Sequence, residues 1–469
     1  MSSVLLITHP HGHRKEREYI FQVLFNEFLG ISYVSRETIG EKVQIQLVDA
    51  PEQGVLILPD VLFQTQVDEW LTIVSLPKQP LSMWDVARCL PEAKVIKSPI
   101  QVIYGKLLRE GTWFNQNGKS IRLGLDIFGS AFFMLTRHEE IVLPDRDEHG
   151  RFPARASLSF QEGFLERPIV DEYVEILWAC MKRMWPELKR KQRSYQIFLS
   201  HDVDHPIGAV NKPWLQVLRN AAGDLVRRKD VHLAVRRLAA KCVGDEDADP
   251  YNTFDFIMDV SERYGLKSTF YFKAGMSNSR FDENYTLDVP WTQSLMQRIH
   301  ERGHEIGLHP SYENYKDIGR LKTEFTKLLD TAEKLGIKQT KWGSRQHYLR
   351  WRNPTTWQNG EEAGLDYDAT VGFTDNIGFR CGTCHEFPVF NLETKRTLRL
   401  RERPLIVMEM TLLDQKYMAL ESEQVIEWLE RLSKACRRCG GTFSLLWHNT
   451  YLIQSWQRKL YLEVVEVVT

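Results

Sequence analysis

The chain has 469 residues, which is too long for one ordinary hydrophobic core, so two or three domains are expected. Its 61 Lys and Arg residues nearly balance 62 Asp and Glu residues, and the formal net charge of −1 excludes a global electrostatic attraction to nucleic acid. No apolar run reaches the roughly 18 residues that a membrane span needs, and "MSSVLLITHP" at the start lacks the basic region of a signal peptide. With seven cysteines at low density, we expect a cytoplasmic protein.

The first 190 residues predict a smaller α/β or α+β domain. Apolar runs at 43–50 and 54–63 are typical of strands, and longer helix-like stretches follow at 129–143 and 170–185. The basic, proline-interrupted run "CMKRMWPELKRKQRS" ends the last of these stretches. We therefore place a domain boundary near residue 190, with a second domain over residues 191–469.

The second domain shows seven predicted strands, most of them followed by a helix. The strands are expected at 195–204, 267–275, 304–309, 339–347, 365–372, 405–412 and 442–449. The helix at 316–335 carries Leu321, Phe325, Leu328 and Ala332 on one face, which is the spacing of an amphipathic helix. Strands and helices that alternate in one long run predict a parallel barrel or a doubly wound sheet.

A long insert separates the first strand of this domain from its helix, at about 207–250. It contains the basic stretch "LVRRKDVHLAVRRLAAK" at 225–241, which has apolar residues at helical spacing. Such a helix is either a solvated lid beside a site or a peripheral contact with the inner, anionic face of a membrane.

Polar side chains end four of the predicted strands. Asp202 and Asp204 end the first strand of the second domain, and later strand ends carry His309, Arg345, His347 and His448. In parallel α/β folds the carboxyl ends of the strands meet, and chemistry is found there. Carboxylates and imidazoles suit a divalent metal such as zinc, cobalt, nickel or manganese. A second carboxylate can act as a base on water, and a histidine opposite can protonate a leaving group.

Four motifs occur in the order found in the polysaccharide deacetylase family: "FLSHDVD", "GHEIGLHPSY", "GSRQHYLRW" and "LLWH". Over about residues 195–450 the chain resembles this family, which has the NodB homology domain and is similar to carbohydrate esterase family 4. The resemblance implies a distorted (β/α)7 barrel and a metal-dependent hydrolase that removes acetyl groups, N-acetyl above all, from a sugar or glycan precursor. "DIFGSAFFMLTRHEE" and "RFPARASLSF" resemble the leader domain of a bacterial subgroup associated with surface-polysaccharide synthesis.

The resemblance also implies catalytic roles for three residues. Asp202 matches the general base, Arg345 the arginine that pairs with this base, and His448 the general acid. Three further residues within these motifs are expected to contact the substrate, namely His347, Tyr348 and Trp447.

For the metal, zinc above all, the resemblance implies Asp204 and His309 as ligands. The family has a second histidine four residues further on, where this chain has Glu313. Glutamate can bind zinc, so Glu313 is the expected third ligand, although water, His205 or His347 could also complete the shell.

Two other functions compete with hydrolysis. The glutamate at 313 leaves open a non-catalytic carbohydrate-binding protein with a degenerate site. "DVD" is also the Asp-x-Asp motif of glycosyltransferases, but that function does not explain His309, Arg345 and His448. The expected partner is an acetylated sugar, a nucleotide sugar or a lipid-linked glycan.

Two Cys-x-x-Cys pairs, Cys381 with Cys384 and Cys436 with Cys439, stand outside these motifs. They could form a four-cysteine zinc site, but residues 385–435 lie between them, a wider gap than structural zinc sites usually have. Free buried thiols are therefore expected.

Overall fold

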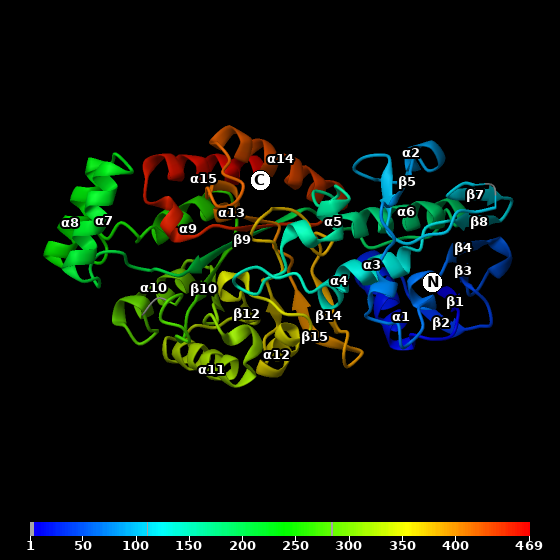
Figure 1. Cartoon of the computed structure of the whole chain (residues 1–469), viewed down its shortest axis with the longest axis horizontal. Coiled ribbons are helices and arrows are strands. Elements are labelled where there is room, and N and C mark those ends of the chain that lie inside the picture. Colours follow the sequence, from blue (N-terminus) through cyan, green and yellow to red (C-terminus); the bar gives the residue numbers. More distant parts are fainter. Residues whose placement is uncertain (1–3, 110, 283–284) are drawn as a thin grey trace. The chain divides into compact units, whose positions relative to one another are not determined.

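The computed structural model describes residues 4–109, 111–282 and 285–469, which fold into two compact units (Figure 1). Unit 1 comprises Met1–Gln196, Gly378–Pro404 and Lys434–Thr442, and unit 2 comprises Ile197–Ile377, Leu405–Ser433 and Phe443–Thr469. Two late segments of the chain therefore return to unit 1. The domain division from the sequence, into 1–190 and 191–469, stays a prediction.

Unit 1 contains, among the described residues, a mixed six-stranded sheet with the order β2-β1-β3-β4-β8-β7. β1 pairs parallel with β2 and β4 with β8, and the remaining neighbours are antiparallel. Alternating residues such as Val43, Ile45 and Leu47 turn into the core, because successive side chains of a strand point to opposite faces. The strands are β1 (Leu5–His9), β2 (Tyr33–Glu37), β3 (Lys42–Leu47), β4 (Val55–Pro59), β7 (Phe114–Asn117) and β8 (Ser120–Leu123).

Helices complete the core of unit 1. The predicted stretch at 129–143 is two helices, α3 and α4, because Arg137 between them has a left-handed φ of 52°. The stretch predicted at 170–185 is α6. A separate antiparallel pair consists of β5 (Ser82–Trp84) and β6 (Ile100–Val102). The helices are α1 (Arg14–Phe21), α2 (Val86–Cys89), α3 (Ile127–Leu135), α4 (Glu139–Val142), α5 (Leu158–Gln161) and α6 (Ile169–Met184).

The first returning segment of unit 1 ends in the antiparallel hairpin of β14 (Phe387–Asn391) and β15 (Arg396–Glu402). It is attached to the amino-terminal part of the unit by polar contacts. The guanidinium of Arg380 pairs with Glu140 at 2.6 Å, and the amide of Val170 donates to the carbonyl of Gly382.

Unit 2 is a mixed α/β structure around a mainly parallel sheet. Its described strands follow in the order β13-β12-β11-β10-β9-β17-β16, and parallel pairing joins β13 through to β9 and β17 to β16. Each of the seven predicted strands coincides with one of these strands, and closure into a barrel stays a prediction. The strands are β9 (Gln196–Val203), β10 (Ser268–Phe272), β11 (Glu305–Leu308), β12 (Gly343–Ser344), β13 (Tyr367–Asp368), β16 (Val407–Met408) and β17 (Thr442–Leu446).

The helices of unit 2 follow the predicted alternation. The helix expected at 316–335 is α11 (Ile318–Lys334), and its predicted apolar face is buried. Asp317 caps it by accepting a hydrogen bond from the amide of Arg320. The strand expected at 405–412 ends at Met408, where α13 begins. The remaining helices are α9 (Phe254–Arg263), α10 (Pro290–Glu301), α12 (Thr355–Ala363), α13 (Glu409–Leu413), α14 (Ser422–Cys439) and α15 (Ser455–Val468), and the end of α14 from Lys434 onward is assigned to unit 1.

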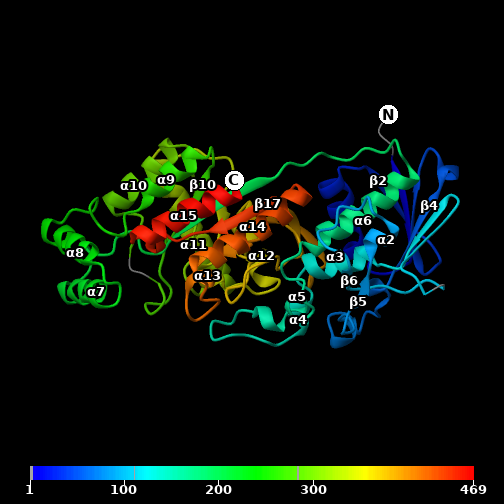
Figure 2. The same cartoon turned by 90° about the horizontal axis from the view of Figure 1, so that it is seen from above.

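The insert at 207–250 contains two helices rather than one basic helix. They are α7 (Trp214–Val226) and α8 (Val231–Val243), which lie side by side as a hairpin in both views (Figures 1 and 2). In the part of the chain that the structure describes, no helix is long and apolar enough to cross a membrane.

Candidate active site

The polar residues predicted at strand ends in unit 2 lie close together. The parallel ladder continues past the strands: the amide of His309 donates to the carbonyl of Phe272, and the amide of Arg345 donates to that of Leu308. These bonds hold the ends of β10, β11 and β12 in register beside β9, which carries Asp202. Neighbouring strand ends therefore direct their side chains to one place.

Asp202 forms a buried ion pair with Arg345. A carboxylate oxygen of Asp202 lies 3.1 Å from a guanidinium nitrogen of Arg345, and both side chains are almost inaccessible to solvent. The same guanidinium donates to the hydroxyl of Ser200 and to the carbonyl of Ala369, so its position is fixed from three sides. The other oxygen of Asp202 lies 3.9 Å from Nε2 of His309 and 3.9 Å from Nε2 of His448.

Asp204 and two histidines form a group whose donor atoms could hold a metal ion. Oδ1 of Asp204 lies 3.2 Å from Nε2 of His309 and 3.2 Å from Nε2 of His347, and the three atoms lie within 4.8 Å of one another. Both histidine rings are buried, and the side chain of Asp204 is 16% exposed. One carboxylate and two imidazoles are a common ligand set for a divalent metal.

The second ring nitrogen of each histidine fixes its protonation. Nδ1 of His309 lies 2.6 Å from the carbonyl oxygen of Arg345, which can only accept, so Nδ1 carries the proton. Nδ1 of His347 likewise donates to Asp282 at 2.9 Å. In the neutral rings both Nε2 lone pairs therefore face Asp204, as is usual for histidines that bind metals.

The buried oxygen and nitrogen atoms of this group are suited to bind a metal ion. Among the residues that the structure describes, Oδ1 of Asp204 and Nε2 of His309 are buried and find no hydrogen-bond partner. Electron-rich atoms that face one another at 3.2 Å repel unless a cation lies between or beside them.

Lys273, which the sequence analysis did not single out, supplies a positive charge beside this group. Its ammonium nitrogen lies 3.2 Å from Oδ1 of Asp204, and the side chain is 1% exposed. Burial opposes ionisation of Asp204, but the ammonium of Lys273 holds the pKa of this carboxyl well below its usual value. Asp204 is therefore a carboxylate at neutral pH, and Lys273 competes with a metal for it.

His448 is held as an imidazolium by Glu409. Nδ1 of His448 donates to Oε1 of Glu409 at 2.6 Å, and the amide of His448 donates to the same oxygen. Burial lowers the pKa of His448, but Glu409, Asp202 and Asp204 more than offset this and raise it to about 9. Its Nε2 points toward Asp204 at 3.6 Å, so a proton is available there.

The other predicted site residues differ in where they lie. Glu313, the expected third ligand, is not part of the group: its carboxylate lies 3.3 Å from Arg350, and His347 takes its place beside Asp204. Tyr348 is 37% exposed and packs against the ring of His347 at 4.7 Å. Trp447 is fully buried against Tyr461, and its expected contact with substrate stays a prediction.

Three residues that complete the site escaped the sequence reasoning. Lys273 and Glu409 end apolar runs at predicted strands, which is the signal that would have found them. Asp282 lies in a loop after β10 and gave no signal. It accepts hydrogen bonds from the amides of Ser277 and Tyr312 as well as from His347, and these bonds outweigh burial and lower its pKa.

Comparison with known proteins gives limited similarity. A family model described as "Family of unknown function (DUF7033)" matches residues 5–186, and no curated protein matches the chain. A solved structure described as a polysaccharide deacetylase from Mycobacterium smegmatis is 15% identical with a TM-score of 0.39, covering 60% of this chain and 85% of that one. Puue allantoinase is 11% identical with a TM-score of 0.37 and the same coverage. At these values the likenesses assign no activity to this chain.

Proposed function

We propose that the protein is a metal-dependent hydrolase that removes acetyl groups, N-acetyl in particular, from a sugar or glycan precursor. The proposal rests on three groups of side chains that lie close together in unit 2. These are a buried carboxylate with its arginine (Asp202 and Arg345), a carboxylate with two histidines, and an imidazolium held by Glu409. Hydrolysis of an amide or ester needs a base, an electrophile and an acid, and these groups match them.

Asp204, His309 and His347 would hold the metal, for which zinc is the proposed identity and cobalt, nickel or manganese are substitutes. When bound, the metal would polarise the substrate carbonyl and lower the pKa of water. Asp282 keeps the ring of His347 in the orientation that presents Nε2 to this position.

Asp202 acts as the general base and accepts a proton from the attacking water on its carboxylate. Arg345 pairs with Asp202 in a buried position at 3.1 Å and fixes the orientation of its carboxylate. His448 acts as the general acid: its Nε2 donates a proton to the leaving nitrogen, and Glu409 keeps that proton in place at neutral pH.

The proposed substrate is an acetylated sugar carried as a nucleotide sugar, a lipid-linked glycan or a free precursor. The exposed aromatic ring of Tyr348 beside His347 supports a sugar, because an aromatic face packs against the apolar face of a pyranose. The panel of substrates in the test therefore covers all three carriers of the sugar.

Acetate release from a panel of N-acetylated and O-acetylated sugars, with zinc-loaded protein, tests the proposal. We expect release with the wild type and a loss of about 10²–10⁴-fold in Asp202→Asn. Asp288→Asn, at a carboxylate that is 69% exposed and pairs with Lys327, is the matched control and should keep full activity. Sugar binding without acetate release would indicate the carbohydrate-binding alternative, and sugar transfer from a nucleotide sugar would indicate a glycosyltransferase.

A further inference from the structure

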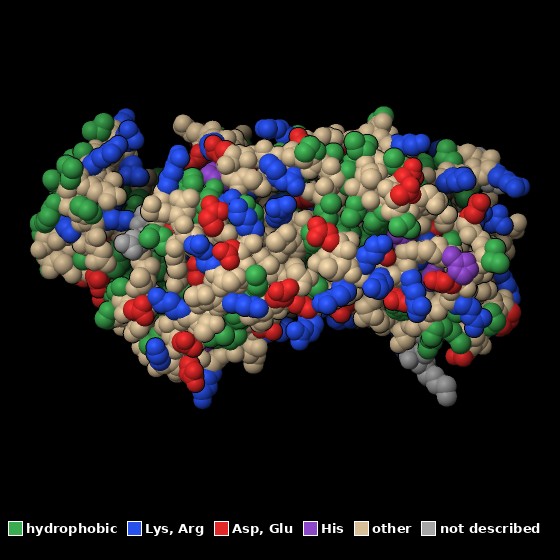
Figure 3. All heavy atoms as spheres, turned by 60° about the horizontal axis from the view of Figure 1, so that its bottom comes forward, with side chains coloured by type: hydrophobic (Ala, Val, Ile, Leu, Met, Phe, Trp, Pro, Cys, Tyr) green, Lys and Arg blue, Asp and Glu red, His purple; other side chains and the backbone are tan. Residues whose placement is uncertain are grey.

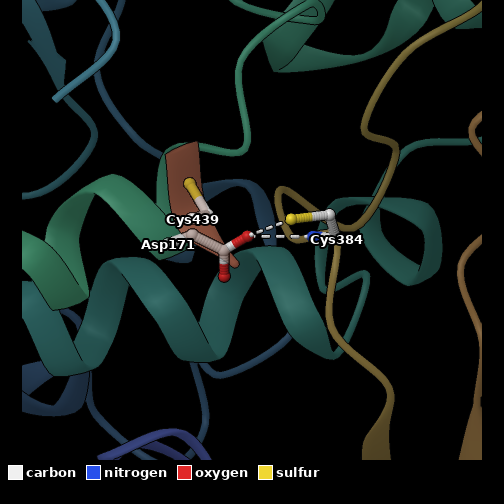
Figure 4. Close-up of side chains that lie close together, drawn as sticks. All are labelled: Asp171, Cys384 and Cys439. Atoms are coloured by element: carbon white, nitrogen blue, oxygen red, sulfur yellow. Dashed lines mark hydrogen bonds between the residues drawn. The ribbon is translucent and has the colours of Figure 1, made fainter. Parts of the chain in front are cut away.

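Unit 1 contains a second group of potential ligands, far in sequence from the first. Asp171 on α6, Cys384 in the first returning segment and Cys439 at the end of α14 bring a carboxylate oxygen and two sulfur atoms within 4.8 Å of one another (Figure 4). Sγ and the amide of Cys384 both donate to Oδ2 of Asp171, at 3.1 and 2.9 Å. Around a tetrahedral zinc with bonds of about 2.3 Å, ligand atoms lie about 3.8 Å apart, so the spacing is close to that of a zinc site.

A fourth potential ligand lies near these three. Cys436 is buried and precedes Cys439 by three residues on α14, so the two residues are neighbours on one helical turn, although Cys436 is outside the group whose atoms lie within 4.8 Å. The chain is shaped to admit Cys384: a Cβ at Gly441 would lie 2.2 Å from its Sγ. Only glycine leaves room there for the thiol.

We propose that Asp171, Cys384, Cys436 and Cys439 bind a thiophilic divalent metal, zinc in particular, as a structural site of unit 1. Thiolates, unlike the imidazoles of unit 2, select zinc over hard cations. Each thiol releases its proton to solvent when the metal binds, and no oxidation is involved. The metal would link α6 to the two segments that return to unit 1. These three parts of unit 1 are separated from one another along the chain.

The surroundings fit such a site. Asp171 and Cys439 line a cavity of about 180 Å³ that gives the metal a way in. Arg190, Arg193 and Arg437 line the same cavity. A dication with three thiolates and one carboxylate has a net negative charge, which these guanidinium groups would stabilise.

Co²⁺ added to the reduced full-length chain tests the site, because thiolate ligands give cobalt a charge-transfer absorption that nitrogen and oxygen ligands do not. The double variant His309→Ala/His347→Ala removes the group in unit 2, so the remaining absorption reports unit 1 alone. We expect the absorption to persist there, to vanish in Cys384→Ser and Cys439→Ser, and to remain in Cys89→Ser, a half-buried free cysteine outside the group.

No charge-transfer absorption in the reduced wild type would overturn the proposal, and this outcome needs no variant that has to fold. An absorption that survives in a folded Cys439→Ser would overturn the ligand set. A disulfide joining Cys384 to Cys436 or Cys439, together with no cobalt absorption after reduction, would show a redox pair instead. None of these outcomes depends on acetate release by the site in unit 2. The metal site of unit 1 and the proposed hydrolase activity can therefore be refuted independently.

The α7–α8 hairpin in unit 2 carries an independent feature, an apolar face turned outward. Large apolar side chains that are 47–82% exposed follow each helix at helical spacing. On the side where the helices pack together lies the buried ion pair of Asp224 and Arg237, at 2.7 Å. The exposed apolar residues are Trp214, Leu215, Leu218, Leu225 and Val226 on α7, and Val231, Val235 and Val243 on α8.

Basic side chains accompany this apolar face. Arg227, Arg228 and Lys229 are exposed at the turn between the helices, directly after Leu225 and Val226. Figure 3 shows apolar and basic side chains together at the left end of the drawn face, where α7 and α8 lie. Exposed apolar surface next to basic residues is what an amphipathic helix presents to an anionic lipid surface.

We further infer that the α7–α8 hairpin docks on the surface of an anionic membrane, with its apolar residues at the level of the headgroups. Each helix has 13 residues, so the hairpin can lie on the bilayer without spanning it. Charge complementarity favours lipid over an apolar protein partner, because the turn places three exposed basic residues in a row, and its one acidic residue, Asp230, is half-buried and caps α8.

Co-sedimentation of the full chain with phosphatidylcholine vesicles, with and without phosphatidylserine, tests the docking. We expect binding only with phosphatidylserine, weakened by salt, and at least about tenfold weaker in Leu215→Ser/Val226→Ser. Arg227→Gln/Lys229→Gln should also weaken it, whereas Ile39→Ser, at a 95% exposed apolar residue of unit 1, should not. Equal binding to both vesicles, no binding, or self-association that needs Leu215 would each overturn the inference.

Discussion

Replacing Glu409 by glutamine tests how the proposed general acid is held. Glutamine keeps the shape and a carbonyl acceptor for Nδ1 of His448 but removes the charge. The rise in the pKa of His448 from 6.5 to about 9 corresponds to about 3 kcal/mol in favour of the imidazolium. At 2.6 Å and an effective dielectric constant of about 20, attraction to Glu409 is about 6 kcal/mol, which exceeds the whole rise. In Glu409→Gln the pKa of His448 should therefore return to 6.5 or below.

Two readouts follow from this change. The pKa of the His448 ring, read from an NMR titration of chelator-treated protein, should be about 9 in the wild type and 6.5 or below in the variant. The basic limb of the pH profile of kcat/KM should move in the same direction, because the acid is lost as pH rises through its pKa. Glu305→Gln, at a carboxylate that pairs with Lys267 at the surface, should leave both unchanged.

The same shift predicts a pH dependence of stability. Because the pKa of His448 is higher in the folded than in the unfolded protein, its protonation stabilises the folded state. This stabilisation is complete below the unfolded pKa of 6.5 and is lost as the pH rises through the folded pKa of about 9. Between these limits the free energy of unfolding of the wild type should fall by about 3 kcal/mol more than that of Glu409→Gln. A variant whose His448 still titrates near 9 would refute the role of Glu409.

Three further predictions concern the metal group. Lys273→Met removes the cation 3.2 Å from Asp204, so zinc should bind at least about tenfold more tightly in chelator competition; weaker binding would contradict competition by the ammonium. Asp282→Asn loosens the ring of His347 and should weaken zinc binding by about 10–100-fold in the same assay, and an unchanged affinity would contradict the orienting role. Glu313→Gln should leave the zinc content of unit 2 unchanged when it is measured by mass spectrometry. Loss of one zinc ion per chain in this variant would show that Glu313 is a ligand.

The strand ends could be predicted because apolar runs that finish in polar residues mark them. Asp202, Asp204, His309 and Arg345 came from this pattern, and the ladder bonds that hold their strands in register explain why they meet. The choice between Glu313 and His347 could not be made from sequence. It depends on Asp282, a loop residue that fixes the ring of His347 and comes from a different part of the chain.

The chain segments that make up unit 1 could not be predicted from the sequence either. A boundary near 190 follows from a basic, proline-containing run, but nothing in the sequence shows that Gly378–Pro404 and Lys434–Thr442 return to the same unit. The wide gap between the two Cys-x-x-Cys pairs argued against a shared site for the same reason. Once both segments pack beside α6, Cys384 and Cys439 become neighbours of Asp171.

An anomalous-scattering map at the zinc edge, from crystals of zinc-loaded protein, tests the central claim most directly. We predict a peak in unit 2 in contact with Oδ1 of Asp204 and Nε2 of both His309 and His347, with the carboxylate of Asp202 beside it. No peak at this position, with the ammonium of Lys273 still paired to Asp204, would contradict a metal-dependent mechanism.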